Sequence, residues 1–227
     1  MTKYLLKQSP KFYYINLIRS SERKDRMERL FQEYELEYER IDAIDGDKLD
    51  DWDERLSKYE QACTLSHLKA IQTFYESDRE TAIICEDDLS FEFVPYWKKS
   101  LSLVIRDAPQ DCDILLLGYI VLPHDYTTLN QEYNSFIAVT HNSTLCYFIT
   151  KKAAEMILKN HNPKHPNLKS FTRIRPVADV IIYDLVKTYV YKYSMFTYPD
   201  NNSSTIHSNH SDLHTQSKSK AKEVFTE

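Results

Sequence analysis

The sequence predicts an α/β fold in which helices flank a largely parallel β-sheet. The main observation is a short apolar run, 82–85, that stops at three consecutive acids, Glu86, Asp87 and Asp88. Such a run is typical of a buried strand that ends at a sheet edge. A helix-patterned segment, 59–75, precedes it, and a helix between two strands favours a right-handed parallel crossover. Because ligands bind beyond the carboxyl ends of strands in open α/β sheets, the acids are expected at a binding edge.

The first half of the chain alternates strand and helix patterns. A β-rich apolar run, 12–17, predicts the first strand, and Met27, Leu30 and Phe31 follow at helical spacing. A second strand is expected over 38–41, before a turn at Gly46. The helix over 59–75 and the acid-ended strand then complete a strand–helix–strand–helix–strand unit.

The second half has a more irregular pattern. Helices are expected over 95–106, 151–160 and 177–187, and strands over 113–118, 144–150 and 190–196. Segment 119–143 is expected to be irregular or antiparallel, and 161–175, with two prolines, is expected to be a loop that could serve as a lid. The prediction is one domain over 1–206 and a polar C-terminal tail over 207–227, with a frayed end over 216–227.

Composition excludes several classes of protein. The 227 residues are 42% hydrophobic, which is enough for a core, and the net charge of −5 with scattered Lys and Arg argues against a nucleic-acid partner. The longest apolar runs fall short of the ~20 residues of a membrane helix, so no membrane span is expected. Four widely spaced cysteines favour free thiols in a reducing compartment, and hence a cytoplasmic location. The oligomeric state has no signal in the sequence.

The three adjacent acids favour a cation site. Their mutual repulsion is relieved if a divalent ion lies among them, and Mn²⁺ or Mg²⁺ prefers oxygen ligands. Along an extended backbone Glu86 and Asp88 point to one side and Asp87 to the other. With only two glycines in the chain, no glycine-rich phosphate loop is available, so a nucleotide must be held by side chains, metal and ordinary backbone amides. An exposed acidic turn is the alternative interpretation.

Seven blocks of the sequence, in order, resemble glycosyltransferase family 25, which includes lipooligosaccharide and collagen galactosyltransferases. They are 14–17 (YINL, followed by Arg19 and Arg23), 43–46 (AIDG), 60–67 (EQACTLSH), 83–88 (IICEDD), 113–118 (DILLLG), 146–154 (CYFITKKAA) and 176–179 (PVAD).

This resemblance implies a GT-A fold, with a Rossmann-like mixed sheet flanked by helices. It also implies a metal-dependent inverting transferase that moves a sugar, expected from a UDP-linked hexose, from a nucleotide sugar to a hydroxyl of a glycan or protein acceptor. Mn²⁺ (or Mg²⁺) would be held by Asp88, Glu86 and, near the end of the chain, His207. Asp179 would be the general base. His67 would either hydrogen-bond the donor sugar or brace the acid loop.

The resemblance further implies donor-binding roles for residues at the ends of the first strands and on the long helix, namely Asn16, Leu17, Arg19, Arg23, Asp45, Ser66, Lys69 and Asp87. A surface role for Arg23 and a helix-capping role for Asp179 are the alternatives. The chain departs from the family where Ala62 and Ser143 replace glycines and where Val180 replaces an acid. A metal-dependent hydrolase and a catalytically silent sugar-nucleotide or glycan-binding protein of the same fold remain alternative functions.

Overall fold

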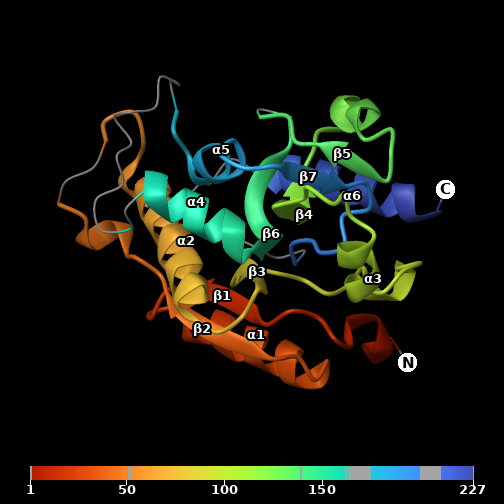
Figure 1. The fold of residues 1–227 in the computed structure, drawn as a ribbon, viewed down its shortest axis with the longest axis horizontal. Helices are drawn as coiled ribbons and strands as arrows, with labels where there is room; N and C mark the ends of the chain where they lie inside the picture. The colour runs from red at the N-terminus through yellow and green to blue at the C-terminus, as the bar shows by residue number, and fades with distance from the viewer. Residues whose placement is uncertain are drawn as a thin grey trace.

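A seven-stranded mixed sheet with the order β2-β1-β3-β6-β4-β7-β5 forms the centre of the molecule (Figure 1). The structure is a computed structural model that describes residues 2–50, 53–138, 140–161, 163, 175–199 and 211–226. The strands are β1 (Phe12–Asn16), β2 (Tyr38–Asp42), β3 (Thr81–Glu86), β4 (Ile114–Ile120), β5 (Tyr133–Ser135), β6 (Asn142–Thr150) and β7 (Thr188–Tyr191).

The strand directions confirm the predicted sheet. β1 pairs in parallel with both β2 and β3, and β4 pairs in parallel with β7. β6 is antiparallel to both β3 and β4, so β1, β2, β3, β4 and β7 share one direction. The carboxyl ends of β1 and β3 therefore lie side by side at one edge of the sheet.

Helices cover both faces of the sheet. They are α1 (Ser21–Glu33), α2 (Lys58–Glu76), α3 (Leu101–Arg106), α4 (Lys151–Asn160), α5 (Ala178–Tyr183) and α6 (Ser211–Thr226), with 3₁₀ turns η1 (Lys3–Leu6), η2 (Gly46–Lys48), η3 (Val94–Tyr96) and η4 (Pro123–Thr128). Because β2 and β3 flank β1 on opposite sides, right-handed connections place α1 and α2 on opposite faces. α4 and α5 pack with α2, whereas α6 packs against β4 (Figure 1).

This connectivity creates a topological switch point. The chain moves from β1 to β2 in one direction and then returns past β1 to β3. The two connecting helices diverge there, and the crevice between the carboxyl ends of β1 and β3 is where ligands bind in open α/β sheets. The acids after β3 are thus placed at the binding edge, as predicted.

The helix α2 is well defined by its sequence. Ser57 and Glu60 form a reciprocal capping box at its start, with each side chain accepting from the other residue's backbone N–H. Leu68, Ile71 and Phe74 are fully buried at helical spacing. The helix therefore has a fixed start and a fixed inward face, and this face carries its polar residues to the sheet edge.

The expectation of a frayed C-terminal end is wrong for the residues described there. Residues Ser211–Thr226 form α6, and Ala221, Val224 and Phe225 on it are buried. The Ser217 hydroxyl accepts a hydrogen bond of 3.1 Å from the Val121 backbone N–H just beyond β4. The polar composition concealed a stripe of small and apolar residues at helical spacing.

Other differences concern element length. Within the predicted helix 95–106 only Leu101–Arg106 is α-helical. Pro95 lies in the 3₁₀ turn η3, and the backbone is extended at Trp97 and again at Ser100, the residue that caps α3. The predicted final strand shortens to β7 and is followed by a bend at 192–193, after which the Phe196 N–H donates to the Leu117 carbonyl of β4 at 3.1 Å. The predicted helix over 177–187 is present as the shorter α5. Nearly all of the predicted lid, 161–175, lies outside the described residues.

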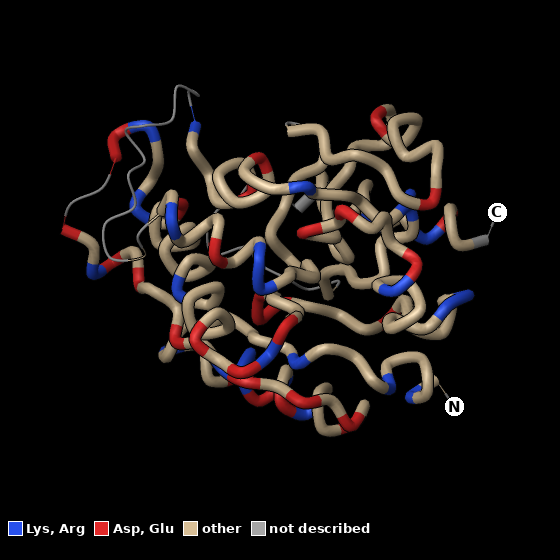
Figure 2. Tube along the Cα trace, viewed as in Figure 1, with Lys and Arg blue, Asp and Glu red and all other residues tan. Residues whose placement is uncertain are grey.

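Charged residues of both signs are interspersed along the trace (Figure 2). This distribution agrees with the scattered Lys and Arg of the sequence. Of the helices in the described ranges, none combines the length and apolar character needed to cross a membrane.

Candidate active site

A pocket opens at the switch point, at the carboxyl ends of β1 and β3. Its walls come from β1 and the loop after it, from the loop after β2, from the first half of α2 and from the three acids. The lining residues are Ile15, Leu17, Arg19, Arg23, Ala43, Ile44, Gly46, Tyr59, Ala62, Cys63, Ser66, His67, Glu86, Asp87 and Asp88. Sequence blocks that are far apart along the chain therefore meet at one place.

Asp87 is held by an internal network. Its carboxylate accepts hydrogen bonds from the Asn16 side-chain amide at 2.7 Å and from the Arg23 guanidinium at 2.9 Å. Arg26 donates to the backbone carbonyls of Asp87, at 2.6 Å, and of Leu89, at 3.0 Å. We call Asn16, Arg23, Arg26 and Asp87 the acid-turn clamp, because together they fix the backbone that carries the acids.

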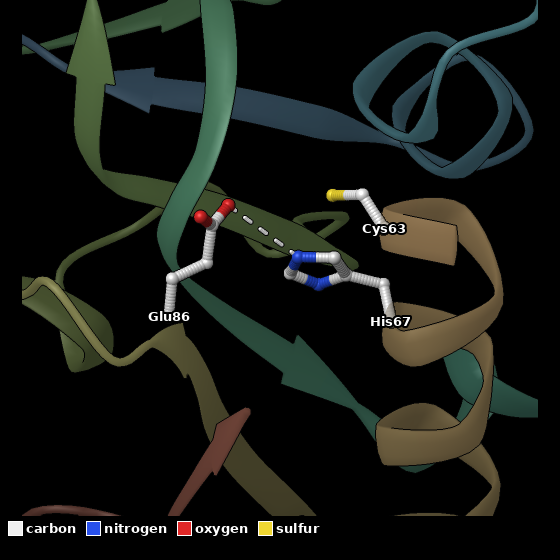
Figure 3. A group of neighbouring side chains, drawn as sticks. All are labelled: Cys63, His67 and Glu86. Carbon is white, nitrogen blue, oxygen red and sulfur yellow. Dashed lines mark ion pairs between the residues drawn. The ribbon is translucent and has the colours of Figure 1, made fainter. Parts of the chain in front are cut away.

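Glu86 points to the other side of β3, toward α2 (Figure 3). The Thr144 hydroxyl donates to its Oε1 at 2.7 Å, and His67 Nε2 lies 3.5 Å from the same oxygen. Burial alone would raise the pKa of Glu86, but His67, Thr144 and Arg23 together lower it below its ordinary value. Glu86 is therefore a carboxylate at neutral pH.

Asp88 follows in the turn and also lines the pocket. Only 8% of its surface is exposed. Its charge favours the protonated forms of Arg23 and Arg26, although burial still lowers the pKa of Arg26. Glu86 and Asp88 thus bring two sets of carboxylate oxygens to one pocket. Asp87 lines the same pocket, because the strand ends at Glu86 and the turn after it does not keep the alternation of side chains.

Two predicted donor-binding residues on α2 make structural contacts. The Ser66 hydroxyl donates to the Ala62 carbonyl at 2.6 Å and accepts from the Ile44 N–H at 2.8 Å. Lys69 does not line the pocket; its ammonium group donates to the Asp42 carbonyl at 2.8 Å. Both residues tie α2 to the end of β2, and Ser66 remains a wall of the pocket.

The loop after β2 closes one side of the pocket through its own ion pairs. Arg19 pairs with Asp45, and Asp45 accepts a hydrogen bond from the Asp47 N–H at 3.1 Å. At Gly46 a Cβ atom would lie 2.6 Å from Cδ1 of Tyr59, so glycine allows the Tyr59 ring to cover the loop. Arg19 lines the pocket whereas Asp45 does not.

Asp179 lies in the first turn of α5, beside the start of β6. The Ser143 N–H donates to its Oδ2 at 3.1 Å and the Val180 N–H donates to its Oδ1 at 2.9 Å. The N-cap of α5 is Val177, so Asp179 does not cap the helix. Burial raises the pKa of Asp179 above its ordinary value, against the two backbone donors, and the charge of Glu86 adds to this rise.

The structure adds polar residues that the sequence did not single out. Tyr147 and His67 are hydrogen-bonded, with 3.2 Å between the Tyr147 hydroxyl and His67 Nδ1. Tyr198 contacts the Ser143 hydroxyl, and its pKa is raised by burial and by the charges of Glu86 and Asp88. Strand alternation could not predict this side of the site, because Ser143, the second residue of β6, has a φ of 91°. His207, the predicted third metal ligand, lies outside the described residues.

The four cysteines are free, as predicted, and Cys63 faces the site. Burial, with a contribution from the Glu86 charge, raises the pKa of the Cys63 thiol well above its ordinary value. A thiol with a raised pKa is a poor nucleophile. The chemistry expected at this pocket therefore depends on its carboxylates.

Comparison with known families agrees with this geometry. The sequence model described as "Glycosyltransferase family 25 (LPS biosynthesis protein)" matches residues 9–170, which include β1, the whole of α2, β3 and all three acids. The chain belongs to glycosyltransferase family 25. Of the predicted site residues, Asp179 and His207 lie beyond the matched range.

Known relatives are similar to this chain over part of their length. Procollagen galactosyltransferase 1-A of Xenopus laevis is 29% identical over 127 residues, covering 47% of this chain and 20% of that protein. A glycosyltransferase 25 family member of Aedes aegypti is 27% identical over 168 residues, covering 65% and 27%. Putative glycosyltransferase R655 of Acanthamoeba polyphaga mimivirus is 29% identical over 136 residues, covering 54% and 41%. The chain thus spans well under half the length of these relatives.

A solved structure shares the fold. It is described as a glycosyltransferase involved in the glycosylation of the major capsid of PBCV-1, and the two chains match with a TM-score of 0.50 and 10% sequence identity. The match covers 89% of this chain and 98% of the other. This likeness supports the α/β fold, with its mixed sheet flanked by helices.

Proposed function

We propose that this protein is a metal-dependent inverting glycosyltransferase that moves a hexose from a nucleoside diphosphate sugar, such as a UDP-hexose, to a hydroxyl of a glycan or protein. The observation that carries the proposal is the meeting of Glu86 and Asp88 in one pocket at the switch point of a family 25 fold. The names of the relatives, procollagen galactosyltransferases, support a hexose donor and a protein or glycan acceptor.

The residues present fit a hard divalent cation. Glu86 and Asp88 supply carboxylate oxygens, which Mn²⁺ and Mg²⁺ prefer, and they line the same pocket. When bound there, such an ion would neutralise charge on the departing diphosphate. The acid-turn clamp keeps both carboxylates in place, so the ligand positions are set before the donor arrives.

The size of the pocket and its lining residue Arg19 suit the diphosphate of a sugar donor. The pocket measures about 110 Å³, less than the roughly 300–1,000 Å³ of sites that enclose a whole drug-sized ligand. It therefore suits the diphosphate end of a donor. Arg19, half-exposed beside Asp45, is positioned to turn from its carboxylate partners to a phosphate, since guanidinium groups bind both anions in the same geometry.

Proton transfer is assigned to Asp179. An inverting displacement needs one carboxylate to accept the proton of the attacking hydroxyl. Asp179 is close enough to Glu86 for their charges to interact, and its raised pKa makes it a stronger base than an ordinary aspartate. His67, hydrogen-bonded to Tyr147 and directed at Glu86, acts as a positioning residue for that carboxylate.

The test is a panel of nucleotide sugars with the purified chain and Mn²⁺, in which nucleoside diphosphate release and donor binding are measured with and without acceptors. Acceptor-dependent release is expected. Asp88→Ala should lower turnover on the order of 100-fold or more while the fold is kept. Asp78→Ala is the matched control, because the Asp78 side chain is 94% exposed.

Three outcomes would contradict parts of the proposal. Sugar release without any acceptor would indicate a hydrolase, and binding without turnover would indicate a silent binding protein. Normal turnover in Asp88→Ala would remove the metal assignment.

A further inference from the structure

A second set of ligand atoms lies beside the acids, on the α2 side of the pocket. Cys63 and His67 are four residues apart on α2 and so share one face of the helix, and Glu86 approaches them from the end of β3 (Figure 3). Their ligand atoms all lie within 4.8 Å of one another. Within the described parts of the chain, this is the group of three such side chains that is compact enough to hold a metal ion.

The imidazole of this group is held in a ligand's orientation. His67 is 1% exposed, and its Nε2 makes no hydrogen bond, while Nδ1 lies 3.2 Å from the Tyr147 hydroxyl. Nε2 is directed at Glu86 Oε1, 3.5 Å away. Metal-binding histidines are typically fixed in this way by a partner on the second ring nitrogen, and ligating carboxylates by a hydroxyl such as that of Thr144.

We propose that Cys63, His67 and Glu86 form a binding site for Zn²⁺. A thiolate, an imidazole and a carboxylate are a ligand set that Zn²⁺ accepts in tetrahedral geometry, whereas thiolate is a poor ligand for Mn²⁺ and Mg²⁺, which prefer carboxylate, carbonyl and water oxygens. All three residues line the pocket, so an ion has an entry path and the fourth position faces the pocket. On binding, the thiol loses its proton to solvent and the sulfur bonds the metal.

The two ligand sets share Glu86. Zn²⁺ held by Cys63 and His67 takes this carboxylate from the oxygen site formed with Asp88. One consequence rests on the proposed transferase function: Zn²⁺ should inhibit the turnover that Mn²⁺ supports. The binding site itself does not depend on that function.

The experiment uses Co²⁺ as a spectroscopic probe on the metal-stripped full chain, without donor. One equivalent of Co²⁺ is expected to give visible bands of tetrahedral cobalt and a near-ultraviolet thiolate-to-cobalt charge-transfer band, both removed by added Zn²⁺. Cys63→Ser should lose the charge-transfer band and weaken binding by about 10- to 100-fold or more. Cys112→Ser is the matched control, since Cys112 is a free, half-buried cysteine outside the pocket.

Asp88→Asn separates the two sites: it should keep the cobalt spectrum although it disrupts the oxygen site. A wild-type chain without a thiolate band, or a band that persists in Cys63→Ser, would overturn the proposal. Should Cys63→Ser fail to fold, X-ray absorption at the zinc edge of the wild-type protein with one equivalent of Zn²⁺ gives the answer. A sulfur ligand at about 2.3 Å from the metal is then expected, and a shell of nitrogen and oxygen alone would overturn the proposal.

Discussion

Glu86 and Asp87 are neighbours in the sequence, yet their side chains enter contrasting surroundings. Asp87 meets the Asn16 amide and the Arg23 guanidinium, and the turn behind it is held by Arg26. Glu86 meets the Thr144 hydroxyl and the ring of His67, with the Cys63 thiol close by. One side of the end of β3 thus faces the cationic groups of Arg23 and Arg26. The other side faces a hydroxyl, an imidazole and a thiol, groups that can all be neutral.

This contrast indicates a structural role for Asp87 and a functional role for Glu86 within one acidic run. The hydrogen bonds of Asp87 connect β1 and α1 to the turn after β3, so its charge is balanced inside the protein. Glu86 has neighbours, His67 and Cys63, whose side chains are of the types that ligate metals, and its charge remains available to the pocket. Asp87, assigned to donor binding from the sequence, is therefore placed to position its neighbours, although it still lines the pocket.

The largest expected effect concerns Asp179, which lies on the Glu86 side. Asp179→Asn should lower turnover by about 10²- to 10⁴-fold, because the amide cannot accept the acceptor's proton. Since only the carboxylate form is a base, kcat/KM in the parent enzyme should fall as pH drops through the raised pKa of Asp179. The pH–rate profile of the residual activity should lose that acidic limb.

The free energy of unfolding serves as the control for this variant. A raised pKa means that folding disfavours the Asp179 charge, which the amide removes, but both carboxylate oxygens accept backbone N–H groups, so the new NH₂ group faces the Ser143 or the Val180 donor. Asp179→Asn should therefore lower the free energy of unfolding by no more than about 1–3 kcal/mol. Asp78→Asn, at an acid whose side chain is 94% exposed, should change neither property. A large loss of stability with an unaltered pH profile would make Asp179 a structural link to Ser143 instead of a base.

The next effect compares Asp87→Asn with Glu86→Gln directly. Asp87→Asn should lower the free energy of unfolding by about 2–3 kcal/mol, because the new NH₂ group faces a donor on Asn16 or Arg23 and the largely buried Arg23 loses its ion pair with Asp87. Glu86→Gln should cost little stability but lower Mn²⁺-dependent turnover by about 10²- to 10³-fold. Urea denaturation and steady-state kinetics on both variants test the contrast. The reverse pattern, with Glu86→Gln the less stable variant, would show that Glu86 has the structural role and Asp87 the functional one.

Much of this arrangement could be predicted from the sequence, and the limits have physical causes. The apolar run before Glu86 and the capped stripe of α2 specify local structure, so β3, α2 and the acids at the sheet edge were predicted correctly. Partners such as Thr144 and Tyr198 come from elements far along the chain, and only tertiary packing brings them to Glu86 and Ser143. The helix α6 was missed because Ser217 and Ala221 supply the first half of its buried face and have little hydrophobic signal, which leaves Val224 and Phe225 as its only large buried apolar residues among those described.

The smallest expected effect concerns Ser143, where the family pattern has glycine. Its φ of 91° lies in the left-handed region, which is strained for any side chain with a Cβ atom. The serine offsets part of this strain, since its hydroxyl accepts from the Leu145 N–H at 3.0 Å and contacts Tyr198. Ser143→Ala should therefore lose both contacts and keep the strain, whereas Ser143→Gly loses the contacts and relieves it. The glycine variant should be about 1–2 kcal/mol more stable than the alanine variant, a melting-temperature difference of roughly 2–8 °C. Equal stability of the two variants would mean that Ser143 is not strained, and that the hydroxyl alone holds this corner beside Asp179.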